Sequence, residues 1–193
     1  MNHNNRIKKC LVSLGLAAAA LGAAGSVNAE EWWQPTGVMA QGGATSGSGS
    51  TSQYAGVGLV WGTHWGADWF GGRVGYHTEL QLNRWNADQA GGGNKGFYQL
   101  AVLPIFRTRT DGGRSRFYAE GGIGPSVFDD VYRTRSKSFS TAFQFTNVLG
   151  AGYNFGLARQ HEVGFRVMHV SNGSIKSPNP GENVIVLRYS YNF

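Results

Sequence analysis

Apolar and polar residues alternate along most of this chain, and this period of two is the feature that most constrains its fold. In 70–83, one parity holds Phe70, Val74, Tyr76, Leu80 and Leu82, and the other holds Arg73, His77, Glu79, Gln81 and Asn83. Successive side chains of a β-strand point to opposite faces, so such a segment has one apolar and one polar face. A strand of about 9 to 11 residues can cross a bilayer with the apolar face toward lipid.

Segments of this kind recur along the chain and are separated by turn-rich sequence. The segments are 36–43, 54–62, 70–83, 97–107, 116–123, 142–152, 161–171 and 184–193. We therefore predict an all-β fold, an eight-stranded antiparallel transmembrane β-barrel of the outer membrane. In a barrel of this size side chains fill the interior, which argues against a porin function. Pro104 has no N–H group, so we expect a bulge or an interrupted pairing there.

Residues 1–29 have a different composition, typical of a secretory signal peptide. Three basic residues, Arg6, Lys8 and Lys9, precede an apolar run, and small residues favour cleavage after Ala29. The predicted organisation is a signal peptide over 1–29 and a barrel over 30–193. Cys10, the only cysteine, lies in the leader, so we expect no disulfide in the barrel. Removing the leader leaves a net charge of about +3, which gives little support for a nucleic-acid partner.

The chain ends on an alternating strand with a terminal aromatic residue. Its apolar parity consists of Ile185, Leu187, Tyr189, Tyr191 and Phe193. This ending resembles the C-terminal signal by which the barrel-assembly machinery recognises outer-membrane proteins, and it predicts that machinery as a partner during biogenesis. The closing strand of a soluble barrel is the alternative interpretation.

A histidine and a hydroxyl two residues apart near the end of the seventh segment are the candidate chemistry. His169 and Ser171 continue the apolar parity of Val167, so they are predicted on the lipid-facing side. Same-face neighbours lie about 6.5 to 7 Å apart, close enough for an imidazole to act as the general base of a serine nucleophile. The turn 178–181 could return the carboxylate of Glu182 to the histidine.

Asn172 and Asn179, or backbone N–H groups after Ser171, are the candidate oxyanion donors. A polar strand end at the water boundary, followed by a turn, would produce the same residues without catalysis. His64, His77 and His161 show no ligand spacing with carboxylates, so neither a metal nor another cofactor is predicted.

The stretch around the histidine resembles a known family. The residues that carry the resemblance are His169-Val170-Ser171-Asn172, Ile175-Lys176, Pro178-Asn179 and Gly181. Together they are similar to the C-terminal signature of the outer-membrane lipid A 3-O-deacylases, the PagL family. The resemblance implies an outer-membrane barrel that hydrolyses the ester-linked 3-hydroxyacyl chain at the 3-position of lipid A through a Ser-His-Glu triad on its outer surface.

Carried over by position, Ser171 is the nucleophile, His169 the base and Glu182 the orienting acid. The family's glutamate can lie one residue further on, where this chain has Asn183. Glu162 and Glu120 are poorer substitutes.

The predicted partners are therefore lipopolysaccharide as the substrate and the surrounding outer-membrane lipids, and a homodimer stays open. One alternative function is a non-enzymatic adhesin or structural barrel. Another is a different lipid-directed enzyme, a phospholipase or an acyltransferase. The charged segment 129–137 is expected in an extracellular loop, either simply solvated or with Arg133, Arg135 and Lys137 meeting lipid phosphates.

Overall fold

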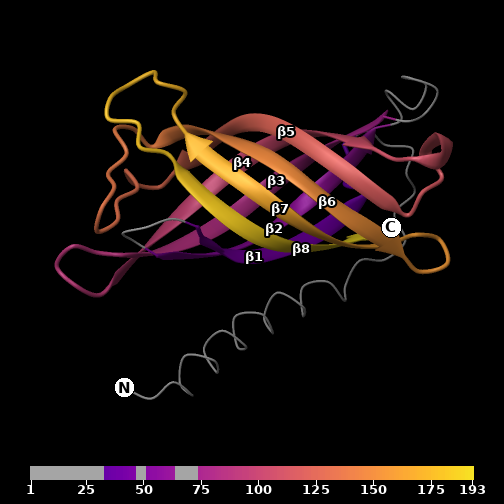
Figure 1. Ribbon diagram of the computed structural model, residues 1–193, viewed down its shortest axis with the longest axis horizontal. Helices are drawn as coiled ribbons and strands as arrows, with labels where there is room; N and C mark the ends of the chain where they lie inside the picture. Colours follow the sequence, from indigo (N-terminus) through magenta and orange to yellow (C-terminus); the bar gives the residue numbers. More distant parts are fainter. Residues whose placement is uncertain (1–32, 47–50, 64–73) are drawn as a thin grey trace, which may run out of the picture.

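The computed structural model describes residues 33–46, 51–63 and 74–193, which form a closed antiparallel β-barrel (Figure 1). Its strands are β1 (Gly37–Thr45), β2 (Ser52–Thr63), β3 (Val74–Asp88), β4 (Asn94–Thr108), β5 (Phe117–Phe128), β6 (Phe143–Phe155), β7 (His161–Ser171) and β8 (Glu182–Asn192). Each strand pairs with the next, and β8 closes the barrel by pairing with β1. The predicted eight-stranded fold is confirmed, whereas the predicted signal peptide lies outside the described residues.

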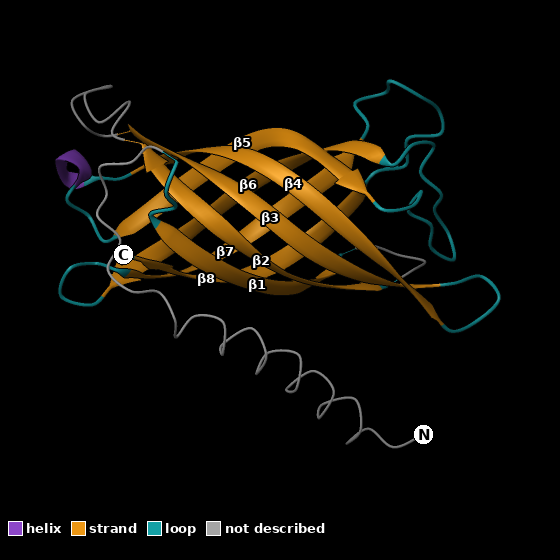
Figure 2. Cartoon of the chain, turned by 180° about the vertical axis from the view of Figure 1, so that it is seen from behind, coloured by secondary structure: helices purple, strands orange, loops and turns teal. Residues whose placement is uncertain are grey.

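The barrel has two different ends. The β3–β4, β5–β6 and β7–β8 connections extend from one end, called the loop end here, and Phe193 lies at the other, the terminal end (Figure 2). A 3₁₀ turn, η2 (Asp111–Gly113), lies in the β4–β5 connection at the terminal end. Within the described ranges, no helix has the length and apolar character needed to cross a membrane.

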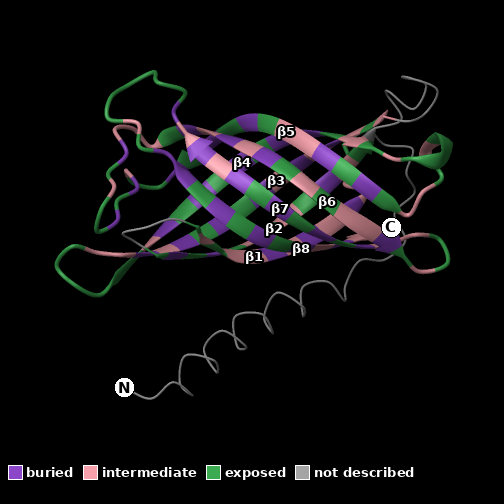
Figure 3. Cartoon of the chain, viewed as in Figure 1, coloured by how far each residue is buried: buried purple, intermediate pink, exposed green. Residues whose placement is uncertain are grey.

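The alternation read from the sequence is the alternation of the barrel wall. On β3, His77, Glu79, Gln81 and Asn83 are buried in the interior, whereas Leu82 is exposed on the outer surface. The same alternation runs along the other strands as bands of buried and exposed residues (Figure 3). The apolar outer face is suited to contact with the hydrocarbon of a membrane. The closed sheet provides hydrogen bonds for the backbone N–H and C=O groups, which lipid cannot provide.

The β4–β5 ladder is interrupted at the predicted position. Pairing runs to Ala101↔Ser126 and resumes at Ile105↔Gly122 in the same register, so no extra residue is inserted between these pairs. Two prolines, Pro104 and Pro125, lie in the gap on opposite strands. Because each lacks an N–H donor, the ladder loses hydrogen bonds from both sides. The feature is an interrupted pairing and not a bulge.

Aromatic side chains fill the interior near the loop end. Trp85 is fully buried, with its ring 4.9 Å from that of Tyr54 and 5.5 Å from that of Tyr132. Tyr132 belongs to the β5–β6 connection, which folds back into the barrel and places the Tyr132 hydroxyl 2.6 Å from Ser52 Oγ. Phe128 and Phe139 pack against the same ring. The connection is therefore anchored in the barrel and does not simply extend into solvent.

Charged side chains fill the interior nearer the terminal end as a closed ring, called the ionic ring here. Three carboxylates and three guanidinium groups alternate around it in the order Glu79, Arg166, Glu120, Arg107, Glu162, Arg188 and back to Glu79. The six N–O distances between neighbours are 2.7 to 3.1 Å. Buried charges are tolerated when they are paired and hydrogen bonded. The ionic ring and the aromatic cluster occupy different levels of the lumen, as expected for a barrel of this size, whose interior holds side chains.

Candidate active site

His169 and Ser171 lie on the outer face of β7, close to the loop end, as their parity predicts. His169 is flanked at the same level by Asn147 on β6 and Asn183 on β8. One level nearer the loop end, Ser171 pairs with Phe145 of β6. Both His169 and Ser171 are partly exposed. A small polar patch therefore interrupts the apolar outer surface of the barrel at these two levels.

Asn183 holds the imidazole of His169. The distance between His169 Nδ1 and Asn183 Oδ1 is 2.7 Å, and the amide oxygen can only accept, so Nδ1 carries the proton in this hydrogen bond. The lone pair is then on Nε2, which is the atom free to take a proton. Among the described residues no hydrogen bond joins the Ser171 hydroxyl to His169. In catalytic pairs this bond commonly shortens only when substrate is bound.

Gly181 packs against the other edge of the imidazole. A Cβ atom at position 181 would lie 2.7 Å from His169 Cε1 and 3.2 Å from Nε2, so the imidazole would have to shift to admit a side chain there. Gly181 also has φ +62°, a conformation that favours glycine. The β7–β8 register pairs Val170 with Glu182, so position 181 follows at the level of Ser171. The ring edge that carries Nε2 therefore points along the strand toward the level of Ser171.

The structure does not bring Glu182 to His169. Glu182 shares the inward parity of Val184 and is 3% exposed, and its Oε1 lies 2.9 Å from Lys137 Nζ. The outward neighbour Asn183 occupies the position expected for the acid. The alternation along β8 could have selected Asn183 from the sequence, because position 183, and not 182, lies on the same lipid-facing parity as Ile185. Glu120 and Glu162, the weaker candidates, belong to the ionic ring.

The two asparagines predicted as oxyanion donors differ in their surroundings. Asn172 points inward, and its Nδ2 donates to Ser140 Oγ at 3.0 Å and to the Lys176 carbonyl at 2.7 Å. Its side chain therefore organises the β7–β8 connection. Asn179 uses Oδ1 to accept the Asn172 backbone N–H at 3.0 Å. No acceptor for Asn179 Nδ2 lies within hydrogen-bond distance in the described part of the chain, so that group remains able to donate.

Apolar side chains cover the outer surface directly below the polar patch. Val167 lies one level below His169 and pairs with Leu149 of β6 and Ile185 of β8. Their exposed fractions are 52%, 71% and 51%, which marks them as surface groups. Phe165 and Leu187 continue the same surface toward the terminal end. The polar patch therefore lies at the border between the loops and a surface suited to hydrocarbon.

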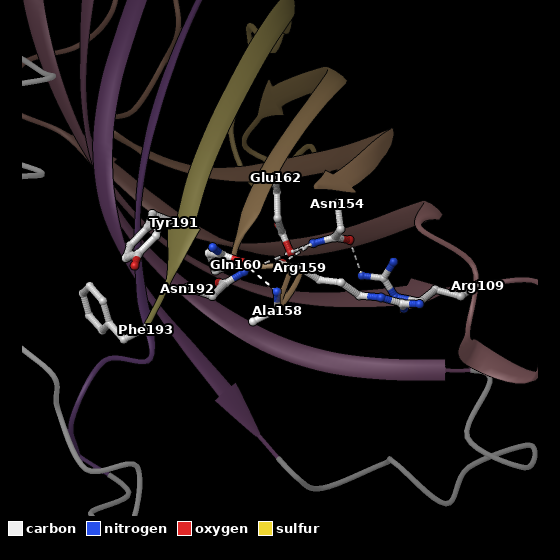
Figure 4. A pocket seen from close by; sticks show the side chains of 9 residues that line it. All are labelled: Arg109, Asn154, Ala158, Arg159, Gln160, Glu162, Tyr191, Asn192 and Phe193. Atoms are coloured by element: carbon white, nitrogen blue, oxygen red, sulfur yellow. Dashed lines mark hydrogen bonds between the residues drawn. The ribbon is translucent and has the colours of Figure 1, made fainter. Parts of the chain in front are cut away.

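A cavity of about 530 Å³ opens at the terminal end, away from His169 and Ser171. Figure 4 shows Asn154 between Arg109 and Glu162, with its amide bonded to the Glu162 carboxylate at 2.9 Å. Glu162 belongs to the ionic ring and is engaged by Arg107 and Arg188. The cavity is therefore the polar mouth of the lumen. In the described ranges, no three His, Cys, Asp or Glu side chains gather in a way that could hold a metal ion.

The fold and the site define an outer-membrane β-barrel with a histidine and a serine on its lipid-facing surface. The sequence model described as Lipid A 3-O-deacylase (PagL) matches residues 53–192. This chain belongs to the lipid A 3-O-deacylase (PagL) family, which confirms the resemblance inferred from the signature residues.

Two curated relatives and one solved structure agree with this assignment. The lipid A deacylase PagL of Bordetella bronchiseptica is 36% identical over 167 residues, covering 83% of this chain and 86% of the relative. The protein of the same name from Pseudomonas aeruginosa is 30% identical over 151 residues, covering 77% and 81%. The crystal structure of the outer membrane enzyme PagL superposes with a TM-score of 0.64 at 26% identity, covering 81% of this chain and 99% of that one.

Proposed function

We propose that this protein hydrolyses the ester that links a 3-hydroxyacyl chain to the 3-position of lipid A, with Ser171 as nucleophile and His169 as general base. In this proposal Asn183 orients the histidine, in place of the glutamate predicted at position 182. The observation that carries it is the 2.7 Å hydrogen bond between His169 Nδ1 and Asn183 Oδ1, on the same outer face as Ser171. Family membership supplies the substrate class.

The proposed reaction has two steps. Ser171 Oγ attacks the ester carbonyl carbon while its proton passes to His169 Nε2, and Asn179 Nδ2 or a backbone N–H of the β7–β8 connection stabilises the oxyanion. The intermediate collapses by breaking the bond to the sugar oxygen, which takes the proton from Nε2. A water molecule, deprotonated by His169, then attacks the acyl-serine. The products are a free 3-hydroxy fatty acid, a 3-hydroxyl group on the sugar and regenerated Ser171.

An asparagine can fulfil the orienting part of the third triad role. Its amide oxygen fixes the Nδ1–H tautomer, as the asparagine of Cys-His-Asn enzymes does. It does not supply the negative charge with which a carboxylate stabilises the imidazolium. We therefore expect a working enzyme whose general-base step is weaker than that of a glutamate-containing relative.

The location of the pair suits a substrate that already lies in the bilayer. The acyl chains of lipid A can lie against Leu149, Val167 and Ile185, which places an ester near the headgroup level beside His169 and Ser171. Substrate can therefore arrive by lateral diffusion without leaving the membrane.

The test is mass spectrometry of lipid A from cells that express the wild type, Ser171→Ala or His169→Asn. Ser174→Ala is a matched control because Ser174 is an exposed hydroxyl in the adjoining connection. Heat-modifiable gel mobility establishes that each barrel has assembled. We expect the wild type and the control to remove one hydroxyacyl group, and the two site variants to leave lipid A unchanged.

Other products identify the alternative functions. Lysophospholipid would indicate a phospholipase, and an added acyl group on lipid A would indicate an acyltransferase. Unchanged lipids with every assembled variant, in cells and in detergent, would favour the adhesin or structural barrel. Activity retained by Ser171→Ala would refute the proposed nucleophile.

A further inference from the structure

We infer that Lys137 is a positioning residue for the reaction, because it holds the chain segment 181–183 against His169. This inference rests on the proposed function of Ser171 and His169. Lys137 lies in the β5–β6 connection, far from the segment in sequence. Its Nζ donates to the Gly181 carbonyl at 3.1 Å and to Glu182 Oε1 at 2.9 Å. One ammonium group therefore joins two consecutive residues of the β8 entrance.

The Glu182 carboxylate depends on this contact. It is 3% exposed, and Lys137 is its ion-pair partner among the described residues. Its second oxygen, Oε2, is buried and has no hydrogen-bond partner in the described part of the chain. A buried carboxylate that loses its cation is strongly destabilised, and a move toward water relieves this cost. Without Lys137, Glu182 would therefore not keep its present position.

A displacement of Glu182 would disturb two contacts of His169, one on each side of its ring. Gly181 packs against the Cε1–Nε2 edge of His169, and Asn183 bonds to Nδ1. These two residues are the direct chain neighbours of Glu182. A shift of about 1 Å in a catalytic group can reduce a rate by about 100-fold, so the position of this segment controls the rate more than it controls substrate binding.

The connection that carries Lys137 is itself well anchored. Tyr132 is buried in the aromatic cluster, and so is Phe139. Between them the Thr134 N–H donates to the Lys137 carbonyl at 2.8 Å, and the Lys137 N–H donates to Thr134 Oγ1 at 3.0 Å. Lys137 is 24% exposed and points at β8. The anchored connection thus acts as a brace, and Lys137 is engaged with protein instead of being free for lipid phosphate.

The experiment measures kcat and KM on lipid A in detergent micelles for Lys137→Met, Glu182→Gln and the double variant. Lys137→Arg is the conservative variant. Arg135→Met is the matched control, since Arg135 is a cation of the same connection that is directed at Asp88, 3.6 Å away. We expect kcat to fall by about 10- to 100-fold for Lys137→Met with little change in KM. The control should match the wild type, and Lys137→Arg should recover most of kcat.

The double variant separates a shared role from two independent ones. If the ion pair acts as a unit, the double variant loses no more than the worse single variant. If Glu182→Gln abolishes activity while Lys137→Met behaves like the wild type, Glu182 acts without Lys137 and the inference is overturned. If Ser171→Ala remains active, the proposed function fails. If Ser171→Ala is inactive and Lys137→Met has the wild-type kcat, the proposed function stands and only the inference about Lys137 is overturned.

A spectroscopic measurement gives a readout that does not depend on turnover. Nitrogen-15 spectra of histidine-labelled barrel in micelles report which ring nitrogen of His169 carries the proton, with His169→Asn used for assignment. We expect the Nδ1–H tautomer in the wild type and in Arg135→Met, and a mixture of tautomers in Lys137→Met. An unchanged Nδ1–H signal in an assembled Lys137→Met barrel would contradict the inference.

Discussion

Removing one member of the ionic ring is expected to lower barrel stability substantially. Arg166 makes three charge-assisted contacts, to Glu79 at 2.8 and 2.9 Å and to Glu120 at 2.7 Å, and its side chain is fully buried. Arg166→Met leaves three carboxylates against two guanidinium groups. Breaking a buried ion pair by removing one partner costs about 3 to 5 kcal/mol, because the remaining charge is left without compensation. We expect a loss of that size in the free energy of unfolding.

A second substitution tests whether uncompensated charge is the cause. Glu79→Gln alone should also cost about 3 to 5 kcal/mol. The double variant restores neutrality, so it should cost at least about 2 kcal/mol less than the sum of the two single variants. These free energies are measured by guanidinium unfolding of the barrel in micelles, with tryptophan fluorescence and gel mobility as the two readouts. Simple additivity, or a loss below about 1 kcal/mol for Arg166→Met, would refute the reasoning.

Arg109→Met is the matched control for this series. Arg109 lies at the same end of the lumen but outside the ionic ring, and it bonds to neutral acceptors, Asn154 Oδ1 at 2.7 Å and the Ser115 carbonyl at 3.2 Å. Partial burial lowers the pKa of Arg109, and the neighbouring positive charge of Arg107 lowers it further. Its removal should therefore change stability by only about 1 kcal/mol or less.

Three further outcomes are expected. Asn183→Asp should raise kcat on lipid A by about tenfold, because a charged acceptor stabilises the His169 imidazolium; Asn183→Ala should lower it by about as much, and equal rates for both would contradict the assigned role. Gly181→Ala should lower kcat at least about tenfold in an assembled barrel, because its methyl group would collide with the imidazole, and a wild-type rate would show that this contact does not matter. Tyr132→Phe should cost about 1 kcal/mol at neutral pH by removing the 2.6 Å hydrogen bond to Ser52. Burial raises the pKa of Tyr132 by favouring the neutral phenol in the folded barrel, so the free energy of unfolding declines as the pH rises above the usual phenol pKa of about 10. Tyr132→Phe has no phenol to ionise, so its free energy of unfolding should decline less with rising pH than that of the wild type. An identical decline in both proteins would show that burial of the Tyr132 phenol is not its cause.

The alternation of side chains made the barrel predictable from the sequence, because it assigns a face to each residue as well as a secondary structure. It placed Glu79 inside and His169 and Ser171 outside. Applied strictly to the last strand, it would also have selected Asn183 and not Glu182, because one step along a strand reverses the face. Chemical type favoured the carboxylate at 182, and strand geometry placed it in the interior.

Other features of the site could not be read from the sequence. Lys137 reaches Glu182 across 45 positions, and no local pattern specifies a contact of that separation. The pairing within the ionic ring was likewise not predictable, since the alternation places each charged side chain inside the barrel but does not specify which of them form ion pairs. Asn172 was an oxyanion candidate by chemical type, yet its amide is used to hold the β7–β8 connection. These arrangements depend on how distant strands and loops meet.

The alternation on β7 also has a consequence for how this protein can change. Arg166 serves the ionic ring, while Val167 and His169 face the membrane from the same strand. Away from the Lys137–Glu182 contact, substitutions on one face leave the other face intact, so the determinants of folding and of surface recognition are interleaved in sequence yet separable by mutation. A library that varies only the outward apolar positions of β7 and β8, with His169, Ser171 and Asn183 kept, would explore new acyl-chain preferences on a barrel whose interior is unchanged.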